Sequence, residues 1–227
     1  RTFAVLLERR LNEAASGVRY EVLVQARSGY GTAQELVVFE NDTFDYAPDL
    51  ALWIYCLNDP AHPLFDNPSA LVNQYHYRPR SYALHWIERQ LFHARRRYIE
   101  GTGECSRGER LDTWSEYLHC VNRKEVALNL ARIADIANHR APVVFAIHPL
   151  MEGTPTWDSY PSKKLHAELA ELARKNGMMP LDLADAFGPE APADVFLPND
   201  QWHLNERGHQ RLAAFLWSAS PPPPAVS

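Results

Sequence analysis

The chain has 227 residues, 46% of them hydrophobic, which suits one sizeable α/β domain with a single core. Its formal net charge of -5 argues against a general electrostatic attraction to nucleic acid. No apolar run approaches the roughly 20 residues that a membrane span needs, and the first residues lack the charged-then-apolar pattern of a signal peptide. The sequence therefore predicts a soluble domain without a transmembrane segment.

The N-terminal part of the chain is expected to form a helix, a strand, a turn and a second helix. Apolar residues near 3.6-residue spacing predict the first helix: Phe3, Leu6, Leu7, Leu11 and Ala14. Alternating apolar residues then predict a strand over 18–24, which ends at the glycine-bearing turn 28–31. A helix through Leu36 and Val37 follows this turn.

The run LALWIYC at 50–56 is almost continuously apolar, which predicts a strand covered on both faces, as in parallel sheets. It ends at Asn58 and Asp59, and a long insertion over 60–111 follows. Apolar residues at helical spacing predict one helix in this insertion: Leu84, Ile87, Leu91, Ala94 and Tyr98. Because long inserts often shape a pocket, we expect a helical cap here.

Beyond the insertion the pattern alternates between helices and strands. The sequence predicts a helix over 126–137, a strand over 142–148, a helix over 165–172 and a short buried strand over 178–183. Asn205 is expected to cap a final helix. The proline-rich segment 219–227 cannot continue that helix and is expected to be disordered.

Strands separated by helical crossovers predict a three-layer α/β/α sandwich with a mainly parallel sheet, formed by a single domain over 1–218. In such sheets ligands gather at the carboxyl ends of the strands. The glycine turn at 28–31, the turn at Asn58 and Asp59, and a loop containing Asp200 and His203 all follow a predicted strand. We therefore expect these three loops to lie at the same edge of the sheet.

The three cysteines, Cys56, Cys105 and Cys120, are an odd number and lack CxxC spacing, so neither a disulfide framework nor a zinc ribbon is indicated. Cys105 and Cys120 could pair across a loop, or both could be free thiols. A zinc site with His119 would lack a fourth ligand at the usual spacing. The sequence leaves the state of this pair open.

The segment NDQWHLNERGH at 199–209 carries the strongest chemical signal in the chain. Asp200 and His203 are three residues apart, just before the final helix, so the carboxylate can hold the imidazole in a turn. An imidazole of near-neutral pKa can take a proton from a serine hydroxyl and return it to a leaving group when a carboxylate fixes its tautomer. This pair alone could also be an exposed contact with no catalytic role.

The order of these segments resembles the SGNH hydrolases, also called the GDSL esterase and lipase family, over nearly the whole chain. The turn ARSGYGTAQEL is similar to the second block of that family, LNDP to the third and DQWHLNERGH to the fifth. The resemblance implies a flavodoxin-like SGNH hydrolase fold. It also implies that Asp200 and His203 activate a serine, and that Gly29 and Asn58 donate to the oxyanion.

The chemistry of ester hydrolysis explains why an oxyanion hole needs residues of these types. The tetrahedral intermediate gains a negative oxygen, so donors must already point at it, and losing one donor costs about 2.7 to 4 kcal/mol. Gly29 lets its backbone N–H approach closely, and Asn58 offers an amide N–H. Taken alone, Gly29 could only supply a positive φ in a turn, and Asn58 could only end a strand; their joint order with Asp200 and His203 favours the hydrolase interpretation.

Two features depart from the family pattern. The first block, GDS with its nucleophilic serine, has no counterpart in the 227 residues, and Ser16, Ser28 and Ser81 do not replace it. We expect that block upstream of Arg1, or on a separate N-terminal fragment that supplies the first strand and the serine, and no hydrolysis by this chain alone. Cys56 stands where the third block usually has glycine, and we expect it to be buried and unreactive rather than a reactive thiol.

The resulting hypothesis is a serine-type ester hydrolase acting on a small-molecule or carbohydrate ester, with no metal, no organic cofactor and no nucleic-acid partner. A non-catalytic acyl-binding or carbohydrate-binding module and an O-acyltransferase are the alternatives, because either water or a hydroxyl can resolve an acyl-enzyme. A metal site at Asp200, His203 and His209 is disfavoured because His209 lies a further turn along the helix. His148 could line the pocket or bond loop backbone, and the run Arg95–Arg97 could be a solvated face or meet an anionic surface.

Overall fold

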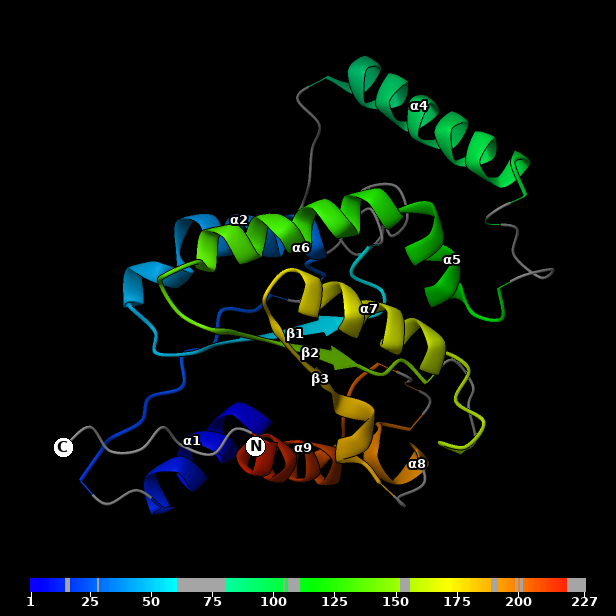
Figure 1. The fold of residues 1–227 in the computed structure, drawn as a ribbon. Helices are drawn as coiled ribbons and strands as arrows, with labels where there is room; N and C mark the ends of the chain where they lie inside the picture. Colours follow the sequence, from blue (N-terminus) through cyan, green and yellow to red (C-terminus); the bar gives the residue numbers. More distant parts are fainter. Residues whose placement is uncertain are drawn as a thin grey trace.

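The computed structural model describes residues 1–14, 17–27, 29–60, 81–103, 105, 111–151, 156–188, 192–198, 200 and 202–219. Within them, helices cover both faces of a parallel sheet with the strand order β1-β2-β3 (Figure 1). The predicted α/β class with a parallel sheet between helices is confirmed. The tail beyond Ala219 lies outside the described residues.

The sheet consists of β1 (Ala51–Cys56), β2 (Val143–His148) and β3 (Met179–Asp182). Its register places Ala51 beside Val143 and Cys56 beside His148, so β1 and β2 end together. All residues of the central strand β2 are buried. The three strands predicted near these positions are therefore confirmed.

Two details of these strands differ from the expectation. Along β1 only alternate residues are buried, with Trp53 and Tyr55 inside and Leu52 and Ile54 partly exposed, so this strand is fully covered on one face only. The strand β3 is partly exposed, and Met179 is 49% exposed. Both strands lie at an edge of the described sheet, whereas β2 lies between them.

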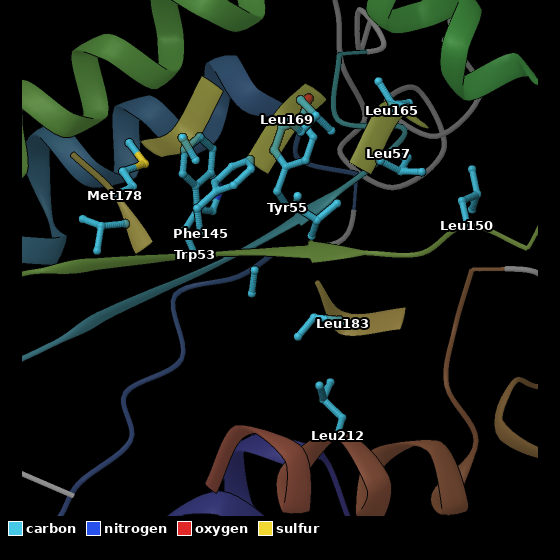
Figure 2. Packing of buried hydrophobic residues seen from close by; sticks show 14 of the residues in the cluster. Trp53, Tyr55, Leu57, Phe145, Leu150, Leu165, Leu169, Met178, Leu183 and Leu212 are labelled. Atoms are coloured by element: carbon cyan, nitrogen blue, oxygen red, sulfur yellow. The ribbon is translucent and has the colours of Figure 1, made fainter. Parts of the chain in front are cut away.

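One face of the sheet is covered by α2 (Thr32–Asn41), α6 (Arg123–Ala137) and α7 (Lys163–Lys175), as the sequence predicts. Figure 2 shows Trp53, Tyr55 and Phe145 pointing to this side, and Leu183 and Leu212 lying on the opposite side. The rings of Trp53 and Phe145 meet edge to face with centroids 4.9 Å apart. The side chains of β1 and β2 thus form one aromatic core under these helices.

The opposite layer contains α1 (Phe3–Ala14) and α9 (Glu206–Ala219), which pack side by side (Figure 1). The Phe3 ring stacks on the His209 ring, and the Phe3 N–H donates to His209 Nδ1 at 3.3 Å. Two shorter elements, η2 (Leu183–Ala186) and α8 (Pro192–Val195), pack on α9, whereas η1 (Thr43–Tyr46) packs on α2 in the other layer. Both terminal helices predicted from sequence are confirmed.

The strand predicted over 18–24 is wrong. The described part of this region, residues 17–27, has no regular secondary structure, and Val24 is 67% exposed. Side chains of α1 bind its backbone instead: Asn12 exchanges two hydrogen bonds with Tyr20, at 2.8 and 2.9 Å, and Glu8 accepts from the Val22 N–H at 2.8 Å. Alternation indicates which residues share a face but not which strand lies alongside, and no strand of the described sheet pairs with this segment.

The described part of the insertion forms the predicted helix α4 (Tyr82–Gly101). Just beyond the insertion lies a helix that was not predicted, α5 (Trp114–Val121). A capping box, in which Thr113 and Glu116 bond each other's backbone N–H, begins α5 and could have been read from the sequence. A disulfide joins Cys105 to Cys120, which settles the question that the sequence left open. Tyr117 donates a hydrogen bond to Glu100, so α5 also holds the last turn of α4. None of the described helices is both long enough and apolar enough for a transmembrane segment.

Candidate active site

Asp200 and His203 form the pair that the sequence predicts. Asp200 Oδ2 lies 2.8 Å from His203 Nδ1, and Asp200 Oδ1 accepts from the backbone N–H groups of Trp202 at 2.8 Å and His203 at 3.0 Å. The carboxylate therefore fixes both the ring and the turn that carries it. With Nδ1 bonded to the carboxylate, Nε2 is the ring nitrogen that remains for proton transfer, and the His203 side chain is 72% exposed.

The charge of Asp200 is supported by its surroundings. Burial acts to raise the pKa of this carboxyl group, but the hydrogen bonds from the His203 imidazole and from the Trp202 and His203 N–H groups outweigh it, so the pKa lies below its ordinary value of 3.8. Asp200 is thus a carboxylate at neutral pH. In this state it can orient the imidazole and stabilise the imidazolium.

The loop that carries this pair is closed by backbone bonds at its base. Phe196 and Leu204 form an antiparallel bridge, and the Leu197 N–H donates to the His203 carbonyl at 2.9 Å. Asn205 Oδ1 accepts from the Gly208 N–H at 3.0 Å, so the predicted cap of α9 is confirmed. The same Asn205 donates from Nδ2 to the Phe196 carbonyl at 3.0 Å, which ties the cap to the bridge.

Gly29 and Asn58 lie in two turns whose neighbouring residues are joined by a backbone hydrogen bond. Gly29 has φ +82°, a backbone conformation that glycine adopts without strain, and Asn58 follows β1 and is half-buried. The Thr32 N–H at the start of α2 donates to the Asp59 carbonyl at 3.1 Å. The residue that follows Asn58 is therefore bonded to the helix that follows the Gly29 turn.

Contacts at the carboxyl ends of the strands connect the two pairs of candidate residues. Cys56, two residues before Asn58, pairs with His148 at the end of β2. The His148 ring meets the Phe196 ring edge to face, with centroids 6.1 Å apart, and Phe196 is bridged to Leu204, the neighbour of His203. The two pairs thus lie at the same edge of the sheet, linked through these intermediate residues rather than by a direct contact.

The helix α5, just beyond the insertion, also reaches this edge. The ring of Trp114, the first residue of α5, meets the ring of Trp202 with centroids 5.8 Å apart. Trp202 directly precedes His203, so α5 borders the loop that carries His203 on one side. This contact was not predicted, because it depends on how the insertion folds back.

Beneath the Asn58 turn lie two carboxyl groups that the sequence did not reveal, the buried Asp59 and the half-buried Glu35. Asp59 Oδ2 accepts from the Cys56 N–H at 2.6 Å, and Trp53 Nε1 donates to Glu35 at 3.0 Å. Burial raises the pKa of Glu35 from 4.5 to about 7, and burial together with the charge of Glu35 raises the pKa of Asp59. The pair forms only when α2 packs on β1, which a sequence pattern cannot predict.

Other candidate groups have structural roles. Burial lowers the pKa of His148 to about 4, and its Nδ1 bonds the Pro149 carbonyl at 2.8 Å, so it is the loop-bonded histidine of the plainer interpretation. His119 uses Nδ1 for the Ser115 carbonyl and Nε2 for the Tyr55 hydroxyl, and the disulfide occupies the two cysteines that a zinc site would need. Burial, followed by the charges of Asp59 and Glu35, raises the pKa of the Cys56 thiol, which keeps it protonated.

A second histidine–aspartate contact differs from the Asp200–His203 pair in the bonding of its ring. His166 Nδ1 lies 2.8 Å from Asp182 Oδ1, but its Nε2 bonds the Tyr160 hydroxyl at 2.9 Å and the ring is buried. Because both ring nitrogens of His166 are hydrogen-bonded within the protein, neither remains to take a proton from a nucleophile. The sequence did not predict this pair, since its members are on different elements.

We expect Glu35→Gln to change how stability depends on pH. The pKa of Glu35 is about 7 in the folded protein and 4.5 ordinarily, so the folded state keeps this proton to higher pH than the unfolded state does. The free energy of unfolding therefore falls as pH rises from about 4.5 to about 7, by at most about 3 kcal/mol. The amide still accepts from Trp53 but does not titrate. Urea unfolding from pH 4 to 8 should therefore give a smaller alkaline loss for the variant.

The matched control is Glu125→Gln, which removes another first-turn glutamate, at the exposed start of α6. Any effect of losing an acidic group near a helix N-terminus is common to both variants. A pH profile for Glu35→Gln that matches the profiles of the control and the unsubstituted protein would show that Glu35 is not protonated in the fold.

Comparisons with known proteins bear on the family and the fold. The sequence model of the GDSL-like Lipase/Acylhydrolase family matches residues 1–211. Among solved structures, the crystal structure of LAE5, an alpha/beta hydrolase enzyme from the metagenome of Lake Arreo, Spain, matches with a TM-score of 0.60 and 17% sequence identity. The match covers 96% of this chain and 80% of that chain. No curated protein matches the chain.

Proposed function

Because the chain belongs to the GDSL-like lipase and acylhydrolase family, we propose that it is the greater part of a serine-type ester hydrolase that works through an acyl-enzyme. In this proposal His203 is the general base and then the general acid, and Asp200 orients it. Gly29 and Asn58 donate to the oxyanion. The observation that carries the proposal is the 2.8 Å contact between Asp200 and His203 Nδ1, on an imidazole that remains open to solvent.

The reaction would begin when a serine hydroxyl gives its proton to His203 Nε2 and its oxygen attacks the ester carbon. The carbonyl oxygen becomes negative and accepts from the Gly29 N–H and the Asn58 amide. Protonated His203 then gives its proton to the leaving alkoxide, which leaves the acyl group on the serine. Water repeats the sequence with the acyl carbon and frees the carboxylic acid. Asp200 stays ionised throughout, in keeping with its lowered pKa.

The nucleophile is proposed to come from the family's first block, which the 227 residues do not include. The described serines have other positions. Ser81 caps α4 by accepting from the Leu84 N–H, and Ser115 and Ser162 are buried. Ser159 donates to the Thr156 carbonyl, and Ser218 donates to the Phe215 carbonyl. Ser16 and Ser28 lie outside the described residues. The block could precede Arg1 in the same polypeptide or lie on a separate fragment.

Substrate access is proposed to run past α5. The contact between Trp114 and Trp202 places two large rings beside the catalytic loop, and such rings suit the acyl chain or the sugar of an ester substrate. The carboxyl pair, Glu35 and Asp59, lies behind Asn58 and supports its turn rather than the substrate. The proposal therefore assigns binding to the cap side of the site.

The proposal is tested by comparing the 227-residue chain with a protein that also carries the residues encoded upstream of Arg1. A p-nitrophenyl ester measures hydrolysis, and a fluorophosphonate labels an activated serine. We expect hydrolysis and labelling at a first-block serine in the longer protein only, with both lost in His203→Ala. Activity of the 227-residue chain that His203→Ala removes would instead place the nucleophile within the chain, with Ser28 the first candidate. Upstream residues without the block would favour a binding module.

A further inference from the structure

The helix α4 of the insertion has an apolar stripe that points away from the protein. Its large members are all exposed: Leu84 by 56%, Ile87 by 47%, Leu91 by 65% and Tyr98 by 76%. They recur at the spacing of a single helix face. No residue of α4 is buried, and Figure 1 shows the helix standing apart from the two layers that cover the sheet.

The opposite side of α4 is the one that contacts the rest of the chain. The Arg96 guanidinium lies over the Tyr117 ring of α5 at 5.3 Å, Glu100 accepts from the Tyr117 hydroxyl, and Ile99 packs on the small core around the disulfide. These residues are three or four apart, so they form one face of the helix. The face that holds α4 in place is therefore polar and aromatic, whereas the face with the leucines points to solvent.

Charge distinguishes α4 from the rest of the protein. The helix contains four arginines and two glutamates, whereas the whole chain has a net charge of -5. Two exposed arginines border the stripe, Arg95 on one side and Arg97 on the other. A long arginine side chain beside an apolar stripe can keep its guanidinium at the level of lipid headgroups while its stem lies along the apolar surface.

We propose that the exposed face of α4 docks on an anionic lipid surface, with Leu84, Ile87 and Leu91 entering the boundary between headgroups and acyl chains. A surface-lying helix of this kind combines an apolar face, basic residues and low overall hydrophobicity. An anionic lipid surface attracts the arginines on both borders of the stripe at once. A second copy of α4 would instead place its own arginines against them, and like charges repel. The inference goes beyond the proposed hydrolysis and does not depend on it.

Such docking would also bring the candidate active site to the lipid. The disulfide between Cys105 and Cys120 and the Tyr117–Glu100 hydrogen bond tie α4 to α5. The other end of α5 contacts Trp202, the neighbour of His203. A single connected cap thus joins the lipid-facing stripe to the catalytic loop.

Vesicle co-sedimentation of the 227-residue chain tests this proposal without any need for catalysis. The vesicles are phosphatidylcholine alone and phosphatidylcholine mixed with phosphatidylglycerol. We expect binding to the mixed vesicles, which Leu84→Ser combined with Ile87→Ser and Leu91→Ser weakens by at least about tenfold. Arg95→Gln combined with Arg97→Gln should weaken binding by about fivefold per arginine in the mixed vesicles at low salt only.

The matched control is Leu128→Ser, since Leu128 is 70% exposed on α6, outside the cap. Leu128→Ser should bind vesicles as the unsubstituted chain does. All variants should have the melting temperature of the unsubstituted chain, because none of the changed side chains is buried. Absence of binding to mixed vesicles, or equal binding by the stripe variant, would overturn the proposal. So would a dimer by light scattering that the stripe variant converts to a monomer, since that would identify a second copy as the occupant. None of these results bears on ester hydrolysis, so the two proposals fail separately.

Discussion

Replacing Asp200 by Asn is expected to lower kcat of the serine-containing enzyme by about 10⁴-fold while the fold is kept. The Asn oxygen can still accept from the Trp202 and His203 N–H groups, as Asp200 Oδ1 does. Its NH₂ group then faces His203 Nδ1, which forces the ring proton onto Nε2 and removes the base. The measurement is kcat on a p-nitrophenyl ester, together with the melting temperature.

The control for this prediction is Asp194→Asn, because Asp194 is an exposed carboxylate near the base of the same loop. Only its backbone carbonyl is used, as the acceptor of Asn205 Nδ2 at 2.9 Å. It should keep ordinary activity. A kcat for Asp200→Asn within about tenfold of the Asp194→Asn value would mean that the carboxylate does not orient the base.

Replacing Gly208 by Ala is expected to be among the most damaging substitutions of a small residue in this chain. A Cβ at Gly208 would lie 2.2 Å from the Val195 carbonyl oxygen and 3.0 Å from Leu204 Cβ. The carbonyl is already fixed as the acceptor of the Asn205 N–H at 3.0 Å, so either the first turn of α9 or the loop that carries Asp200 and His203 must move. We expect a loss of about 3 kcal/mol in the free energy of unfolding, with a large fall in kcat.

The matched control is Gly101→Ala, at the last residue of α4, where a Cβ would meet no atom within 4 Å. Urea unfolding should show little change there, since Ala is the better helix former. If Gly208→Ala were as stable and as active as this control, the close approach of α9 to Val195 would not exist in solution.

Sequence patterns predicted the three strands of the described sheet but not everything that packs against them. The continuous apolar runs at β1 and β2 identify strands, but only β2 is buried on both faces, whereas β1 is fully covered on one face. The strand predicted over 18–24 was wrong because an alternating pattern forms a strand only where another strand pairs with it. The α1 side chains Glu8 and Asn12 bind the backbone of this segment instead. The apolar stripe of α4 was predicted, but its direction depends on which face contacts Tyr117.

The candidate site was predictable where the residues are close in sequence. Asp200 and His203 are three apart, so their contact follows from one turn. The place of Asn58 at the carboxyl edge follows from the rule that parallel strands end together, because Asn58 follows β1. Gly29 follows no described strand, so its place depends on the hydrogen bond from Thr32 to Asp59 instead. The carboxyl pair of Glu35 and Asp59 and the ring contact of Trp114 with Trp202 were not predictable, because each joins elements whose packing no local pattern specifies.

The central claim is that the Asp200–His203 pair faces the same reacting carbon as Gly29 and Asn58. The most direct test is a crystal structure of the serine-containing protein after reaction with a phosphonate ester, which imitates the tetrahedral intermediate. We predict a phosphonyl oxygen within hydrogen-bond distance of the Gly29 N–H and Asn58 Nδ2, and His203 Nε2 within such distance of the modified serine oxygen. An adduct whose phosphonyl oxygen contacts neither donor, or lies away from His203, would contradict the account.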